Sequence, residues 1–128
     1  MDIQIKIGIG EAYDRLTILE IKLERIKDNN KIENITKEYE YLTSIMATII
    51  SPSDDDGLLE KSIFRLKEVN KELWDVEKDL REYEKNNTFD KAFIIMARNV
   101  YKFNDERADL KKIINKYHNS YFIEEKSY

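Results

Sequence analysis

The scarcity of backbone breakers constrains the fold of this chain more than any other feature of its sequence. Its 128 residues include three glycines and one proline, while Lys, Glu, Leu and Ile recur throughout. Glycine and proline disfavour helices most strongly, so a chain with few of them favours long helices joined by short connections. The mass of 15.4 kDa fits one domain, which we expect to cover residues 1–128.

Apolar residues recur every three or four positions in four stretches, which is the spacing of helices with one buried face. We expect Gly10 to cap the first helix, Asn30 to begin the second in a capping box, and Thr88 to cap the fourth. Aspartates in the loop 51–57 are candidates to cap the third. The expected helices cover about residues 11–27, 30–49, 58–85 and 89–118.

These elements predict an all-α, four-helix, bundle-like fold with antiparallel up-down topology. The short turn at 86–88 brings residues 70 and 104 of the two long helices opposite each other. Near the start, Ile3–Ile9 alternates apolar and polar residues, and Ser120–Ile123 is rich in aromatic and β-branched residues. We therefore expect a small two-stranded β-ribbon formed by the N- and C-termini.

Composition and charge argue against several classes of function. The chain has no cysteine, which excludes disulfides and thiolate chemistry. We expect a cytoplasmic protein, because no secretory signal is visible and the apolar stretch 45–50 is far shorter than the about 20 residues that span a bilayer. The net charge of −4 and the pI near 5.2 argue against nucleic acid. We expect no nucleic-acid or membrane partner, no cofactor and no metal.

Some apolar residues lie outside the expected buried faces of the helices. They are Ile18 and Ile21 in the first helix, and Ile94, Ile95 and Ile113 in the fourth. Helices of unequal length would leave part of this apolar surface exposed in a monomer. We therefore expect a homodimer.

A stripe of polar residues continues the buried face of the fourth helix. After Val100, the positions expected to be apolar are Asn104, Arg107, Lys111 and Asn115. Buried charges cost several kcal/mol unless they are paired, so the stripe needs an explanation. Similar residues stand beside the buried faces of two other helices: Asn70, Trp74, Glu77, Arg81 and Glu84 in the third, and Glu11, Arg15 and Lys22 in the first.

Three interpretations of these polar residues stay open. They form a structural network in which Arg107 pairs with Glu11 or Glu77, or they face solvent where the helices splay. In the third interpretation they line a ligand pocket. Arg107 and Arg15 clamp the anionic group of the ligand, and Lys111 adds positive charge. The asparagines bind polar groups of the ligand, and the tryptophan stacks on a ligand ring. The candidate ligand-binding residues are Arg107, Lys111, Asn104, Asn70, Trp74, Glu77, Arg15 and Glu11.

Four segments carry a resemblance that covers nearly the whole chain. They are Gly10–Lys22 (GEAYDRLTILEIK), Val69–Glu84, Asn104–Asn115 and Glu124–Tyr128 (EEKSY). In these segments the chain resembles a family of short helical proteins from bacteria and viruses whose function is unknown. The resemblance implies a stand-alone domain and carries over no catalytic residues. It also implies a sugar nucleotide as the favoured ligand, because relatives lie near genes for surface-polysaccharide assembly.

Our favoured hypothesis is binding, with or without turnover, of a small anionic metabolite such as a sugar nucleotide in a polar pocket between helices. The alternative is a non-enzymatic helical dimer that acts as a protein–protein interaction module. Two enzyme classes are less favoured. A metal-dependent pyrophosphohydrolase would use carboxylate pairs such as Glu106 and Asp109, but these point away from the expected buried face. A chorismate-mutase-like enzyme would share the cationic stripe, but its motifs are absent.

Overall fold

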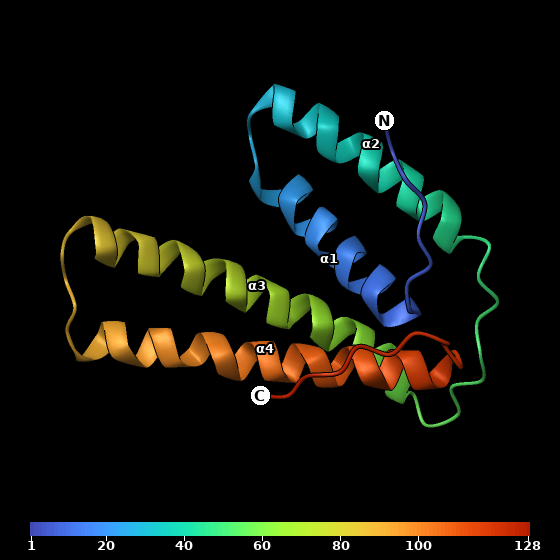
Figure 1. Ribbon diagram of the computed structural model, residues 1–128. Helices are drawn as coiled ribbons and strands as arrows, with labels where there is room; N and C mark the ends of the chain where they lie inside the picture. Colours follow the sequence, from blue (N-terminus) through green and yellow to red (C-terminus); the bar gives the residue numbers. More distant parts are fainter.

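The computed structural model describes residues 1–128 and contains four α-helices and no β-strand (Figure 1). The helical part of the predicted fold is confirmed. The helices are α1 (Ile9–Arg25), α2 (Asn29–Met46), α3 (Leu58–Lys85) and α4 (Lys91–Tyr117). No helix is both long enough and apolar enough to cross a membrane.

Aspartates cap three of the helices, as predicted for α3 but in place of the predicted residues for α2 and α4. The side chain of Asp28 accepts hydrogen bonds at the start of α2, and that of Asp90 accepts one from the backbone of Phe93 in α4. Asp54 and Asp56 accept hydrogen bonds from the first amides of α3, as expected for this loop. The predicted caps at Asn30 and Thr88 are therefore wrong by two residues each, because a nearby aspartate supplies a stronger acceptor.

The first helix begins at Ile9, and its N-cap is Gly8, two residues before the predicted cap. Gly10 instead lies inside the first turn of α1, where it is buried against α4. A Cβ atom on Gly10 would collide with the backbone carbonyl of Lys111. This glycine is therefore required by the close approach of two helices and not by helix capping.

Helix α1 lies at the centre of the arrangement. It packs against each of the other three helices, whereas α2 packs against α1 alone. Helices α3 and α4 form a long antiparallel hairpin that extends well beyond α1 (Figure 1). The predicted register of this hairpin is confirmed, since Arg65 pairs with Glu106 and the ring of Tyr83 lies beside that of Phe93.

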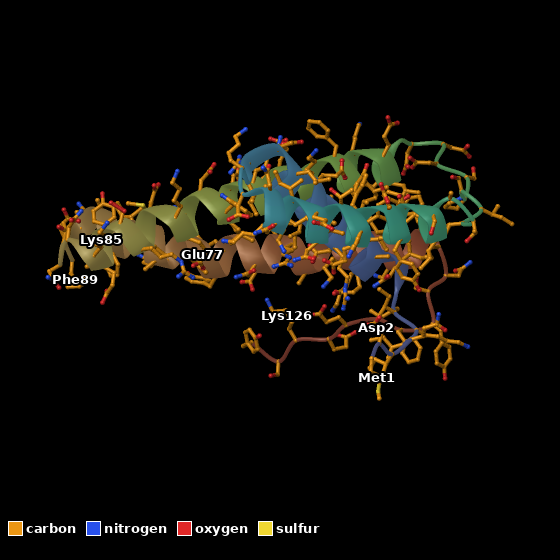
Figure 2. All side chains as sticks on the ribbon, turned by 90° about the horizontal axis from the view of Figure 1, so that it is seen from above. Met1, Asp2, Glu77, Lys85, Phe89 and Lys126 are labelled. Carbon is orange, nitrogen blue, oxygen red and sulfur yellow. The ribbon has the colours of Figure 1, made fainter.

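The hydrophobic core occupies only the half of the hairpin that α1 covers. Its buried side chains come from α3 and α4, and α1 adds further buried residues against α2. No residue between Trp74 and Asp109 is buried. We call residues 74–103 the arm, because this part of the hairpin extends beyond α1 and α2 (Figure 2). The hairpin core consists of Leu59, Leu66, Val69, Leu73, Leu110 and Ile114.

The predicted terminal β-ribbon is wrong. The segments 1–8 and 119–128 contain no strand, and no backbone–backbone hydrogen bond joins them. The two ends of the chain meet without strand pairing: the amide of Ile9 donates to the side chain of Ser120 at 3.1 Å, and Gly8 lies against the backbone carbonyl of Phe122. After Asn119, which has a left-handed φ of 51°, the chain turns back along α4 and away from the N-terminal segment. Ion pairs from Glu124, Glu125 and Lys126 hold this tail along α4 and not along the N-terminal segment.

Candidate functional site

Asp14 of α1 is the centre of a buried polar network that joins three helices. Its side chain is 2% exposed and accepts two hydrogen bonds from Arg107 of α4, one of them from Nε at 2.8 Å. Asn70 of α3 donates to the same carboxylate through Nδ2 at 3.0 Å. The pairing with Asp14 raises the pKa of the Arg107 guanidinium. Arg107 therefore stays charged, and the ion pair holds α1 on the hairpin.

Thr17 completes this network on α1. The Nδ2 group of Asn70 also donates to Thr17 Oγ1 at 2.9 Å, and that hydroxyl donates to the backbone carbonyl of Asp14 at 2.8 Å. Thr17 is 3% exposed and Asn70 is 5% exposed, so both are withdrawn from solvent. Each buried polar group thus has a partner, which is the condition under which such groups are tolerated in a core.

Lys111 forms a second charged centre one helical turn further along α4. Its Nζ atom lies 2.6 Å from a carboxylate oxygen of Glu11 and 2.6 Å from one of Glu124. Burial alone would lower the pKa of the Lys111 ammonium, but these two hydrogen bonds outweigh it and the pKa is raised. The same contact lowers the pKa of the Glu124 carboxyl. Lys111 therefore ties the C-terminal tail and α1 to α4.

The start of α1 has no free backbone amide to offer to an anion at its first two residues. The amide of Ile9 donates to Ser120, and the amide of Gly10 donates to Asn115 Oδ1 at 2.7 Å. Asn115 is 3% exposed and thus acts as a buried cap for this helix end. The last polar residue of the predicted stripe accordingly has a structural role.

A groove of about 800 Å³ opens beside these two charged centres. One wall is α4, the start of α1 forms another, and the C-terminal tail runs along the third. The tail cation Lys126 lies 3.1 Å from Asp105 and 5.0 Å from the centre of the Tyr128 ring. The lining residues are Glu11, Asp14, Val100, Tyr101, Asn104, Asp105, Arg107, Ala108, Lys111, Glu124, Lys126 and Tyr128.

Only some of the predicted site residues meet at this groove. Glu11, Asn104, Arg107 and Lys111 line it, and Asn70 lies beneath it in the Asp14 network. The interpretation that Arg107 pairs with Glu11 or Glu77 is wrong in its partner, since Asp14 takes that place.

The remaining three predicted residues lie outside the groove. Arg15 is exposed and pairs with Glu11 at 3.1 Å. Trp74 lies at the base of the arm, where the guanidinium of Arg25 sits 5.9 Å from its ring centre. Glu77 is exposed on the arm with no ion-pair partner (Figure 2). The predicted pocket roles of these three side chains find no support in their positions.

Sequence reasoning missed Asp14 and Thr17, although a signal for them exists. Gly10, Asp14, Thr17 and Ile21 recur at helical spacing and are all buried, so they form a second buried face of α1. The apolar spacing predicts only one buried face for this helix. The tail residues Glu124, Lys126 and Tyr128 carried no comparable signal, because the tail has no secondary structure.

Fold and site together define an all-helical protein with a buried ion-pair network beside a polar groove. Residues 3–128 match the family of unknown function DUF6165, and the chain belongs to this family. Comparison with curated proteins and with solved structures finds no match. No group of three or more acidic or histidine side chains is arranged to hold a metal ion.

Proposed function

We propose that the protein binds a small anionic metabolite, with a sugar nucleotide as the favoured class, in the groove between α4, α1 and the C-terminal tail. The observation that supports this most is that Arg107, Lys111 and Lys126 line one groove of about 800 Å³. Binding sites for small molecules occupy about 300–1,000 Å³, which includes this volume. A mononucleotide sugar would fit such a space and would bring the negative charge that these cations attract.

The groove cations are already paired, so the ligand has to exchange with carboxylates of the protein. Glu124, which pairs with Lys111, has a side chain that is 56% exposed, and Asp105, which pairs with Lys126, is 52% exposed. The cations of these pairs are largely withdrawn from solvent, at 10% exposure for Lys111 and 19% for Lys126, so a ligand phosphate would reach them by displacing the exposed carboxylates.

Asp14, by contrast, is buried and stays with Arg107. That pair uses Nε and Nη2 of the guanidinium and leaves Nη1 without a hydrogen-bond partner. Nη1 would donate to the ligand while Asp14 holds the group in a fixed orientation. Tyr101 and Tyr128 line the same groove, and their rings would stack on a base or a sugar.

Turnover of the ligand is a subordinate part of the proposal. Glu11 and Asp105 are the groove carboxylates that would act as a general base, and no metal is required for binding itself.

The proposal also includes a cytoplasmic location, which fractionation of cells with detection by antibody tests. Retention of the protein in the membrane or external fraction would contradict that location.

The test of binding is a thermal-shift series with UDP-glucose, ADP, glucose 6-phosphate and inorganic phosphate. A ligand at 100 times its Kd adds about 2.7 kcal/mol, which raises the Tm of a chain of this size by on the order of 10 °C. Lys126→Gln removes a groove cation and leaves Asp105 unpaired, so we expect the shift to shrink or disappear.

Lys112→Gln is the matched control. Lys112 also pairs with a tail carboxylate, Glu125 at 2.9 Å, but it does not line the groove. We expect it to keep the full shift. No shift with any of the four compounds, or an equal loss of the shift in both variants, would overturn the proposal.

A further inference from the structure

The arm has more apolar surface than a two-helix hairpin can enclose. Its side chains that face the partner helix, such as Leu80, Phe93 and Met96, are only half-buried. Others are largely exposed: Phe89 at 52%, Ile94 at 55% and Ile95 at 50%. Two helices bury one stripe on each other and leave the flanks of both stripes in water, so a stable hairpin of this length needs a further layer.

The total surface of the molecule supports the same conclusion. The accessible surface is 9319 Å², whereas a monomeric protein of 15.4 kDa exposes about 7,200 Å². The excess of about 2,000 Å², to which the extended termini and the arm both contribute, exceeds the about 800 Å² that each partner buries in a stable interface.

The two halves of the arm differ in charge, since the α4 half is basic and the α3 half has a slight excess of acidic residues. In α4, the stretch from Lys91 to Asn104 contains the cations Lys91, Arg98 and Lys102 and no acidic residue. In α3, the acidic residues of the arm beyond Asp75 outnumber the basic ones by one. None of these charges takes part in an ion pair within the chain. The acidic residues are Glu77, Asp79, Glu82 and Glu84.

We propose that the arm is the interface with a second copy of this chain. In a two-fold arrangement, α3 of each arm lies against α4 of the other, and the two hairpins close into a four-helix bundle. This pairing covers the exposed apolar side chains of both copies and brings the acidic half of one arm against the basic half of the other. A second copy fits better than an unrelated partner because both complementary halves are present in the same chain. The inference does not rest on ligand binding in the groove.

The first test is the mass of the full chain in solution, measured by light scattering and by sedimentation over a concentration series. We expect a dimer for the wild type, and we expect Ile94→Glu with Ile95→Glu to raise the dissociation constant by about 100-fold or more. Phe64→Glu is the control, because Phe64 is 70% exposed on α3 outside the arm. It should leave the dimer unchanged. A monomeric wild type at all concentrations, or an equal effect of the control, would overturn the proposal.

The second test isolates the pairing of α3 with α4. One variant reverses charge in α4 (Arg98→Glu with Lys102→Glu), and the other reverses it in α3 (Asp79→Lys with Glu82→Lys). Each variant alone has like charges at both contacts, so we expect monomers with unchanged helix content by circular dichroism. An equimolar mixture restores opposite charges at both contacts, and native mass spectrometry should detect the mixed dimer. Homodimers of either variant, or the absence of a mixed dimer, would contradict this geometry.

Discussion

The covered half of the α3–α4 hairpin and the arm are built from the same two helices with the same kind of sequence pattern. Their polar residues nevertheless differ, because those of the covered half are withdrawn from solvent and paired, whereas those of the arm are exposed. In the covered half, Asn70 and Arg107 stand beside the apolar stripe and are drawn into the network around Asp14. In the arm, Glu77 and Arg81 continue the same stripe of α3 and remain exposed without partners. The difference is the presence of α1.

A polar residue at a core-like position is therefore buried or solvated according to which helices lie beside it, and not according to its own helix alone. Helix α1 ends where the arm begins, with Arg25 pairing with Asp75 at 2.7 Å. Wherever α1 covers the hairpin, a polar side chain has to find a partner because water is excluded. Beyond that point it is solvated and costs nothing. The energetic consequences of substitutions should therefore differ sharply between the two regions.

The largest expected difference is between Asp14 and Glu77. Asp14→Ala leaves the Arg107 guanidinium in a largely buried position without its acceptor, which costs about 3–5 kcal/mol. At protein concentrations where the chain is monomeric, Glu77→Ala removes an exposed carboxylate that has no partner, and we expect the free energy of unfolding to change by less than about 0.5 kcal/mol. Urea unfolding followed by circular dichroism measures both. Similar losses of unfolding free energy for the two variants would mean that the arm is as tightly structured as the covered half.

Lys111 and Lys112 allow a buried and an exposed ion pair to be compared within a single turn of α4. Lys111→Met removes a buried cation that two carboxylates share, and we expect a loss of about 1.5–3 kcal/mol. Lys112→Met removes an exposed pair with Glu125 and should cost less than about 1 kcal/mol. Urea unfolding gives these values, and hydrogen exchange should detect a loosened tail in the first variant only. Equal losses would show that the Glu11–Lys111–Glu124 cluster adds no stability beyond a surface pair.

Gly10 tests the close approach of α1 and α4. A helical Gly→Ala substitution normally stabilises by up to about 1 kcal/mol, but here the added methyl group meets the backbone carbonyl of Lys111. We therefore expect Gly10→Ala to destabilise by about 1–2 kcal/mol. Ala92→Gly in the exposed first turn of α4 is the control for propensity, with an expected loss below about 1 kcal/mol. A Gly10→Ala variant of raised Tm would contradict the packing of these two helices.

Much of the fold was predictable from the sequence because helix positions depend on local periodicity. The four helices and the antiparallel register of α3 and α4 follow from apolar spacing and one short turn. The ends of helices were less predictable, since several residues near Asp28 and Asp90 are capable caps. The predicted terminal ribbon is wrong because ion pairs direct the tail along α4. These pairs join the tail to residues of α4, such as Lys111 and Asp105, and the alternating pattern of the two termini gives no sign of them.

The candidate site was predictable in part for the same reason. Arg107, Lys111 and Asn70 stood out as polar residues in line with apolar faces, and the structure brings them together beside the groove. Their main partner, Asp14, was missed because one buried face was assigned to α1, and a helix between two layers has two. Which faces are buried depends on how many neighbours a helix has, and periodicity within that helix does not encode this number.

The smallest expected effect concerns pH and the tail pair between Glu124 and Lys111. The hydrogen bond from Lys111 lowers the pKa of Glu124 in the folded protein. A carboxyl with a lowered folded pKa stabilises the native state above its unfolded pKa of about 4.3, and this contribution is lost as the pH falls through the folded value. Since Glu124 is largely exposed, the effect is small.

We expect the difference in unfolding free energy between the wild type and Glu124→Gln to be constant above about pH 5 and to vanish in more acidic solution. Urea unfolding at a series of pH values from 3 to 7 measures this difference. A difference in unfolding free energy that grows as the pH falls would contradict the prediction. It would mean that the folded protein raises the pKa of Glu124 and binds this carboxyl in its protonated form.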